Sequence, residues 1–236
     1  MPIDTKFRST AAEIMDDFAM EGDILTDALD KIAAINKLLG GNKVTLEGVR
    51  MLIQNNNTDK LSITDVGCGN GAMLRMLADY ARKNHLNFEL KGIDANKCTI
   101  AHAVSCSLNY PEIQYQCSDI FDQSKDTERC DIMLFTLTLH HFSDGQITNL
   151  FNNLIKGVFV GIVVNDLERS GLAYRLFTAL SYVFKLNDMS REDGLVSILR
   201  GFKKADLKRY EKALDITSSY IGWRWAFRYL WVIKTR

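Results

Sequence analysis

Short apolar runs recur at nearly regular intervals along the middle of the chain, separated by polar and glycine-containing segments. Runs of this length that are rich in β-branched residues predict buried strands, and the segments between them show the apolar period of amphipathic helices. Strands that alternate with helices are typical of a parallel sheet with helices on both faces. The sequence thus predicts an α/β fold whose first five strands cover residues 62–66, 89–93, 114–117, 132–135 and 158–164.

Residues 1–57 carry a helical pattern instead. Thr10-Ala11-Ala12-Glu13 has the spacing of a capping box and predicts the start of a helix. An apolar helical stripe then runs from Ile24 to Leu39 and stops at Gly40-Gly41, and a third helix is expected over residues 46–54. These helices form an N-terminal cap that either packs against the sheet edge or makes a lid over a bound molecule; the sequence leaves both alternatives open.

A second helical segment follows the fifth predicted strand. Residues 171–200 read as a helical insertion whose aromatic side chains either pack on the sheet or line an apolar pocket. A further helix is expected over residues 203–214, and the alternation from Trp223 to Ile233 indicates strand. Because no linker divides the chain, we expect one domain over residues 1–236, with its core at 58–236.

Composition narrows the class of protein. The 236 residues are 47% hydrophobic and 25% charged, as in a globular domain with a core of its own. The formal net charge is zero, so no overall field attracts nucleic acid or an anionic membrane. We therefore expect no nucleic-acid partner, and the oligomeric state stays open.

The cysteines and the apolar runs bear on the compartment. Five cysteines without a Cys-x-x-Cys pair, set among apolar neighbours, predict buried thiols in a reducing cytosol. The start of the chain lacks the pattern of a signal peptide, and the longest apolar run, at residues 158–164, is far below the ~20 residues that span a bilayer. The prediction is a cytoplasmic protein without stable membrane insertion.

The strongest chemical signal lies where the first strand ends. Asp65 is followed by the glycine turn Gly67-Cys68-Gly69-Asn70-Gly71 and then by a helical pattern. Glycines allow a tight reversal and let a ligand approach the backbone, and the helix start beyond them offers free N–H groups. The spacing G-x-G-x-G differs from the dinucleotide fingerprint G-x-G-x-x-G, and Asp65 would repel a pyrophosphate but suits an ammonium group. A nicotinamide oxidoreductase is therefore disfavoured.

Two further acids end the next strands. Asp94 follows the second strand, where a carboxylate can accept hydrogen bonds from both hydroxyls of a ribose. Asp119 follows the third strand and could receive an adenine amino group. A ligand with an ammonium group, a ribose and an adenine but no pyrophosphate is S-adenosylmethionine (SAM).

These motifs, together with 131–136 and Leu139-His140-His141-Phe142, resemble the cofactor half of the class I SAM-dependent methyltransferases. The resemblance covers residues 61–142 and implies a Rossmann-like, seven-stranded, mostly parallel sheet whose last strand is antiparallel. Members often carry Pro-Gly-Gly before the fifth strand, where this chain has Lys156-Gly157. The cofactor-binding residues implied are Asp65, Gly67, Cys68, Gly69, Asn70, Gly71, Asp94, Ala95, Ser118, Asp119, Ile120 and Phe135.

Candidate residues for the acceptor side follow the fourth and fifth strands. His141 is a candidate base near neutral pH, and His140 a candidate acceptor contact, although either ring could simply pack beside the cofactor loop. Asn165 and Asp166 could position a polar acceptor, and Arg169 could bind its carboxylate or form a structural ion pair. Tyr174 of the insertion is a candidate pocket residue. No set of carboxylates and histidines is spaced for a metal ion on this side.

The function we expect is methyl transfer from SAM to a small organic acceptor, with O-methylation of a phenolic or polyketide-derived compound favoured. The run Asn165-Asp166-Leu167-x-Arg169-Ser170 resembles a bacterial methyltransferase subgroup linked to aromatic polyketide and pigment pathways. C-methylation of a quinone-like ring and a non-catalytic SAM-binding module are the alternatives.

Overall fold

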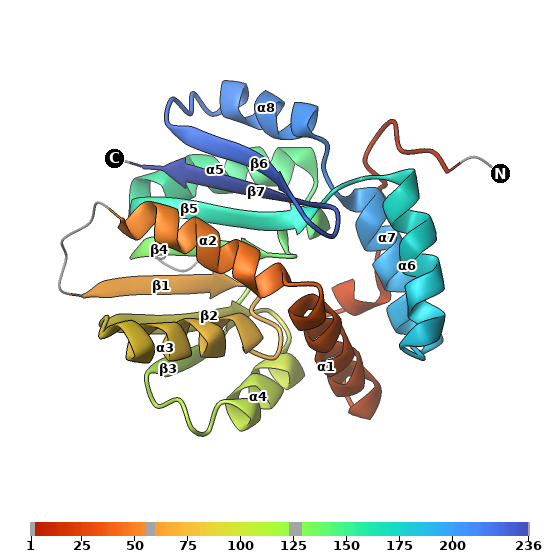
Figure 1. Cartoon of the computed structure of the whole chain (residues 1–236), viewed down its shortest axis with the longest axis horizontal. Coiled ribbons are helices and arrows are strands. Elements are labelled where there is room, and N and C mark those ends of the chain that lie inside the picture. Colours follow the sequence, from red (N-terminus) through yellow and green to blue (C-terminus); the bar gives the residue numbers. More distant parts are fainter. Residues whose placement is uncertain (1–2, 55–59, 123–128, 236) are drawn as a thin grey trace.

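Seven strands form one sheet in the order β3-β2-β1-β4-β5-β7-β6 (Figure 1). The computed structural model describes residues 3–54, 60–122 and 129–235. Strands β1 to β5 are parallel, and β7 runs antiparallel to both of its neighbours, β5 and β6. The predicted seven-stranded, mostly parallel sheet is therefore confirmed. The strands are β1 Leu61–Val66, β2 Phe88–Asp94, β3 Ile113–Cys117, β4 Cys130–Thr136, β5 Val158–Leu167, β6 Ser219–Arg224 and β7 Arg228–Lys234.

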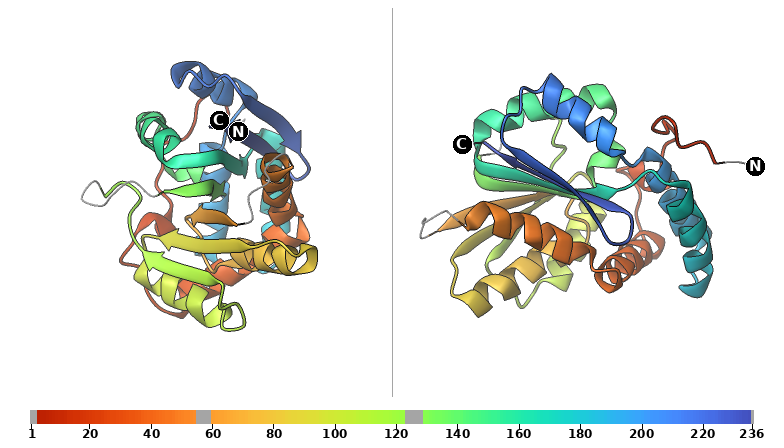
Figure 2. Two further views of the ribbon diagram at one scale, coloured as in Figure 1. Left: turned by 90° about the vertical axis from the view of Figure 1, so that its left-hand side faces the viewer. Right: turned by 45° about the horizontal axis from the view of Figure 1, so that its top comes forward.

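Helices cover both faces of the sheet because the central strands present apolar side chains on both sides. One face packs against α2 (Gly41–Ile53), α3 (Ala72–Asn84) and α4 (Lys97–Cys106). The other packs against α5 (Asp144–Gly157) and α8 (Lys204–Ala213), where Phe151 stacks on Trp231 at a ring-centroid distance of 5.5 Å. Figure 2 shows the two helical layers on either side of the twisted sheet.

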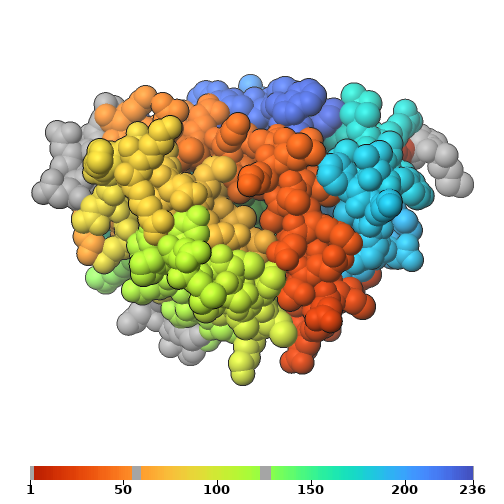
Figure 3. Space-filling model, turned by 60° about the horizontal axis from the view of Figure 1, so that its bottom comes forward, coloured from red at the N-terminus to blue at the C-terminus, as the bar shows by residue number. Residues whose placement is uncertain are grey.

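Three more helices stand beyond the carboxyl ends of the parallel strands (Figure 1). They are α1 (Asp23–Leu38), α6 (Gly171–Val183) and α7 (Asp188–Arg200), and the last two form the helical insertion that the sequence predicts. In the space-filling view α1 lies between α4 and the α6–α7 pair (Figure 3). Of the N-terminal helices, α2 thus packs on the sheet while α1 covers its carboxyl edge. None of the helices in the described ranges has the length and apolarity needed to cross a membrane.

The prediction that the first helix begins at the capping box of residues 10–13 is wrong. Residues 3–13 are not helical, and a single 3-10 turn, η1 (Ile14–Asp16), forms after them, with the capping box between Glu13 and Asp16. Distant contacts hold this arm extended: the Ser9 amide donates to Leu199 O, and Arg8 donates to the carbonyl oxygens of His140 and Phe142. Tertiary hydrogen bonds here override a local signal for a helix.

Two other expectations differ from the structure. Helix α2 begins at Gly41, directly after the left-handed Gly40, and not at residue 46. Only Cys68 and Cys130 are buried; Cys98 is half-buried, and Cys106 and Cys117 are exposed. The expected boundary between N-terminal cap and core, at residues 57 and 58, lies outside the described residues.

Candidate active site at the carboxyl edge of the sheet

A cavity of about 720 Å³ opens at the carboxyl edge of the parallel strands, under α1, α6 and α7. This is the edge where open α/β sheets bind their ligands. Twelve of the predicted site residues line it: Asp65, Gly67, Cys68, Gly69, Asn70, Asp94, Ala95, Ser118, Asp119, Ile120, His140 and His141. The fold thus gathers residues from four strand ends around one space.

The glycine turn gives the cavity one bare backbone wall. Gly67, Gly69 and Gly71 all have positive φ, a conformation that side chains with a Cβ rarely adopt. At Gly69 an added Cβ would meet only Leu29, at 3.8 Å, so the backbone faces open space. At Gly71 a Cβ would lie 2.0 Å from Tyr115 Oη, so this glycine serves the packing of α3 against β3 and does not line the cavity.

Two carboxylates stand beside this wall. Backbone N–H groups of Gly69 and Asn96 donate to Asp94 Oδ2 and Oδ1, at 3.2 and 3.0 Å, and fix the orientation of the carboxylate. Asp65 is buried, its Oδ1 has no partner, and burial together with the charge of Asp94 raises its pKa to about 8. An unpartnered buried acid calls for a cation or donor. The pair therefore fits a ligand that carries both an ammonium group and a diol.

The two histidines lie on the turn η2 (Leu139–His141) after β4, and each is held by a different acid. His141 Nδ1 donates to Asp16 Oδ1 at 2.6 Å, and the ring remains 28% exposed toward the cavity. Burial alone would raise the pKa of Asp16, but hydrogen bonds from His141 and Arg200 hold it well below its usual range. Because Nδ1 carries the proton, Nε2 of His141 keeps a free lone pair in the neutral ring.

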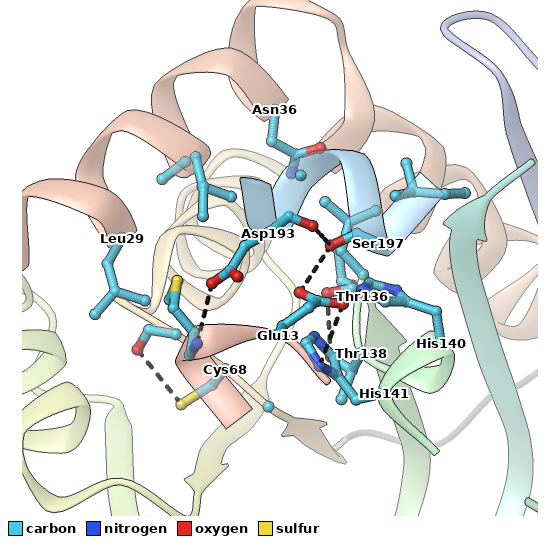
Figure 4. Close-up of a pocket in the computed structure, with 18 of the residues that line it drawn as sticks. Glu13, Leu29, Asn36, Cys68, Thr136, Thr138, His140, His141, Asp193 and Ser197 are labelled. Carbon is cyan, nitrogen blue, oxygen red and sulfur yellow. Dashed lines mark hydrogen bonds and ion pairs between the residues drawn. The ribbon is translucent and has the colours of Figure 1, made fainter. Parts of the chain in front are cut away.

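His140 is the buried member of the pair. Its Nδ1 donates to Asp166 Oδ1 at 2.7 Å, and its backbone N–H donates to Asp166 Oδ2 at 3.0 Å. Burial favours the neutral form of Asp166, yet the charge and hydrogen bonds of His140 lower its pKa. The Nε2 atom of His140 is buried without a hydrogen-bond partner, 3.6 Å from Glu13 Oε1. Figure 4 shows Glu13 and both histidines around one point of the cavity wall.

Glu13 is the residue that sequence reasoning missed. It is buried, Ser197 donates to its Oε2 at 2.8 Å, and burial raises its pKa to about 7. Helix α7 brings it here, because Asp193 accepts hydrogen bonds from the Ile14 and Met15 amides at 2.7 and 3.0 Å. The spacing of Glu13 and Asp16 shows only a local cap, so the sequence has no signal for this placement.

Glu13, His140 and His141 also correct the expectation that this side lacks a metal-binding arrangement. One donor atom from each lies within 4.8 Å of the others, a spacing that a metal ion could use. The guanidinium of Arg200 already pairs with the acids at this point: Arg200 Nη1 is 2.6 Å from Asp16 Oδ2 and 3.7 Å from Glu13 Oε1. We therefore interpret the cluster as a proton-handling site.

Six predicted site residues do not line the cavity within the described part of the chain. Gly71, Phe135 and Tyr174 are in the surrounding structure, and Phe135 stacks on Phe151. Asn165 is fully buried and donates to Gly41 O and Thr45 Oγ1, at 2.9 and 3.0 Å. With Asp166 bound to His140, neither residue has the expected place against an acceptor.

Arg169 forms a structural ion pair, the second of the two alternatives that the sequence leaves open, and it does not line the cavity as a contact for an acceptor carboxylate. Its guanidinium pairs with Asp206 at 2.9 Å and donates to the carbonyl oxygens of Gly201 and Thr5, at 2.6 and 3.0 Å. All of these partners lie away from the cavity, so the side chain ties α8 and the N-terminal arm to the end of β5. The arginine that does line the cavity is Arg228, at the start of β7.

Comparisons with known proteins agree with this geometry. Residues 63–158 match a family model described as a methyltransferase domain, whereas no curated protein sequence matches the chain. Among solved structures, the plantazolicin methyltransferase BpumL in complex with a pentazolic desmethylPZN analog and S-adenosylhomocysteine (SAH) is similar, with 15% identity over 88% of this chain and 90% of that one and a TM-score of 0.66. The magnesium protoporphyrin IX methyltransferase of Synechocystis PCC 6803, with bound SAM, has 13% identity over 93% and 88% of the two chains and a TM-score of 0.56.

Each of these neighbours has a sequence identity at which the likeness establishes the fold alone. The family match adds the methyltransferase domain itself, over the segment that contains the glycine turn, Asp94 and the two histidines. Asp65, Asp94 and the open Gly69 are suited to SAM on the geometry given above. The chain thus contains a methyltransferase domain over residues 63–158, and the cavity of this domain is suited to SAM.

Proposed function

We propose that this enzyme methylates the hydroxyl group of a small organic acceptor, a phenolic or polyketide-derived compound, with His141 as the general base. The observation that carries the proposal is the 2.6 Å hydrogen bond from His141 Nδ1 to Asp16, on a ring that is exposed to the cavity. A carboxylate that holds Nδ1–H leaves Nε2 as the basic atom and stabilises the imidazolium that forms. This is the arrangement that deprotonation of a hydroxyl needs.

The cofactor side of the proposal rests on residues of the first three strand ends. SAM supplies an electrophilic methyl group on a sulfonium sulfur. Asp94 would accept hydrogen bonds from the ribose hydroxyls, Asp65 would face the ammonium group, and Ser118, Asp119 and Ile120 would lie along the adenine. Gly67, Cys68, Gly69 and Asn70 would leave the backbone open to the ligand, and Ala95 would flank the ribose.

The acceptor side is mostly apolar. Leu176, Phe177 and Leu180 of α6 line the cavity, and so does Trp225 of the β6–β7 turn. Apolar walls with a few polar groups are typical of sites for small organic ligands. The enzyme's contribution is then alignment of the acceptor and exclusion of water, with His141 removing the proton. In this scheme His140 lies in the wall of the cavity, and Asn165 and Asp166 are positioning residues behind it.

Transfer of an isotopically labelled methyl group tests the proposal. The purified enzyme is incubated with [methyl-¹³C]SAM and a panel of phenols, hydroxynaphthoquinones and quinones, and products are assigned by ¹³C NMR. A labelled methoxy carbon in the product would support the proposed O-methylation. A labelled methyl carbon on the ring would instead show C-methylation of a quinone-like ring. SAH binding without transfer to any member of the panel would indicate a non-catalytic module.

Activity should survive chelation of metal ions. The guanidinium of Arg200 already pairs with Asp16 and lies 3.7 Å from Glu13 Oε1, the acids that a cation would need. We expect the initial rate in the presence of EDTA to equal the rate without it. A ten-fold loss that Mg²⁺ or Zn²⁺ restores would instead assign Glu13, His140 and His141 to a metal.

Binding of the cofactor product should release a proton near neutral pH. With a pKa of about 8 in the free protein, Asp65 is mostly protonated at pH 7. An ammonium group beside it favours the ionised form, so the complex holds fewer protons and the affinity for SAH rises as pH increases from 6 to 8. Calorimetry at pH 7 in two buffers of different ionisation enthalpy should show release of up to roughly 0.9 proton.

Asp65→Asn is the matched control for this measurement, because its amide has no proton to release. The variant should show the same binding enthalpy in both buffers. Equal enthalpies in the wild-type protein would contradict the placement of Asp65 beside an ammonium group.

A further inference from the structure

Arg228 is a buried cation that lines the cavity and has no ion-pair partner in the described ranges. It is the first residue of β7 and is 3% exposed. Its Nε and Nη1 atoms are both buried without a hydrogen-bond partner. Burial lowers the pKa of Arg228 to about 10, against the opposing charge of Asp166. An arginine in such a position is costly to the fold unless something supplies a negative charge.

The neighbouring polar groups supply that charge only in part, and none of them forms an ion pair with Arg228 in the described ranges. Asp166 is engaged by His140, and Glu168 accepts a hydrogen bond from Trp223 at 2.8 Å. Asn36 Oδ1 is also buried without a hydrogen-bond partner. It lies near Arg228, because a Cβ built on Gly41 would be 1.8 Å from Asn36 Oδ1 and 2.9 Å from Arg228 Cζ. One amide oxygen is neutral and can accept from few of the five guanidinium N–H groups. The positive charge is therefore offset only in part, by Asp166, and no ion pair to Arg228 forms among the described residues.

The position of Arg228 separates it from the cofactor residues. The glycine turn follows β1 and Asp94 ends β2, whereas Arg228 opposes Leu167 at the end of β5, two strands beyond β1 in the sheet order. Nearby in sequence, Trp225 and Phe227 line the same cavity, as do the apolar side chains of α6. Arg228 is also the only lysine or arginine among the described lining residues. A single guanidinium suits one monoanionic group.

We propose that Arg228 binds an ionised carboxylate of the acceptor, so that the substrates are hydroxylated carboxylic acids with an apolar body. The planar guanidinium can donate two parallel hydrogen bonds to a carboxylate. The proposal deepens the proposed function, since it assumes that the acceptor occupies this side of the cavity. It also explains why Arg169, whose donors are already used, does not perform this task.

The test compares acids with their methyl esters in the presence of saturating SAH. The probes are 4-hydroxybenzoate, 4-hydroxyphenylacetate and 4-hydroxycinnamate, each with its methyl ester, and affinity is measured by isothermal titration calorimetry. The wild-type enzyme should bind at least one acid about ten-fold tighter than its ester, and Arg228→Met should remove this preference while the affinity for the ester stays the same. Arg228→Lys should retain part of it. If no acid is preferred by the wild-type enzyme, the proposal is overturned.

Arg169→Met is the matched control, because it removes a buried arginine whose charge is compensated. It should lower the melting temperature and keep the acid-to-ester ratio, whereas Arg228→Met should keep or raise the melting temperature. A lower melting temperature with an unchanged ratio in Arg228→Met would make Arg228 merely structural. A ten-fold loss of SAH affinity in Arg228→Met would assign the carboxylate to the cofactor. All of these measurements report binding or stability. They therefore test the role of Arg228 even if the enzyme transfers no methyl group in the labelling experiment.

Discussion

His141→Ala is expected to lower the turnover number at neutral pH by roughly 10²- to 10⁴-fold, the usual contribution of a general base, with SAH affinity unchanged. The ring is the half-exposed histidine of the cavity, and Asp16 fixes its proton on Nδ1. Removing it takes away the lone pair that would accept the acceptor's proton. The measurement is the single-turnover rate with the best acceptor found in the labelling experiment, together with SAH calorimetry.

The pH dependence and two companion variants distinguish loss of a base from general damage. A phenol that is already ionised needs no base, so the deficit of His141→Ala should shrink as pH approaches the acceptor's own pKa. Asp16→Asn should show a smaller rate loss, because the ring remains but its imidazolium loses a charged partner. His140→Ala should mainly lower stability, by about 3–5 kcal/mol, since Asp166 would be left as an unpaired buried charge. Wild-type turnover in His141→Ala at neutral pH would reject the histidine as the base.

Asp94→Ala is expected to weaken the binding of SAH by about 10- to 100-fold. Two backbone N–H groups orient this carboxylate at the end of β2, in the wall of the cavity. Its removal would leave both ribose hydroxyls without an acceptor, a cost of roughly 1–3 kcal/mol. Titration calorimetry with SAH measures the effect.

Asp119→Ala is a useful comparison for the Asp94 variant. Asp119 also lines the cavity, but it is exposed, and water can replace the hydrogen bond it makes. Its loss should cost less than that of Asp94. SAH affinity that is unchanged in a folded Asp94→Ala protein, or binding of NADH in its place, would contradict the assignment of Asp94 to the ribose.

The elements predicted from the sequence with the best accuracy are those whose determinants are local. The strands predicted over residues 62–66 and 89–93 depend on neighbouring residues only, and both form as expected. The glycine turn with its positive φ angles depends on the short stretch from Gly67 to Gly71. The predicted start of a helix at Thr10 fails, because hydrogen bonds from Arg8 and Ser9 to distant segments outweigh a local signal.

The arrangement of the acceptor side is decided by pairs that are far apart in the sequence. Glu13 and Asp16 reach His140 and His141 only because α7 holds η1 through Asp193 and Arg200. Neither acid differs from an ordinary helix cap when read in sequence.

The two arginines at the ends of neighbouring strands make the same point. Arg169 follows β5, and its backbone N–H donates to Phe202 O while its side chain pairs with Asp206. Arg228 begins β7 and lines the cavity. The sequence by itself determines the α/β fold, the strand ends and the residues that suit a cofactor, since apolar period and turn chemistry are local. Which charged side chains face the acceptor depends on strand register and on helix packing, and these form only when the whole chain folds.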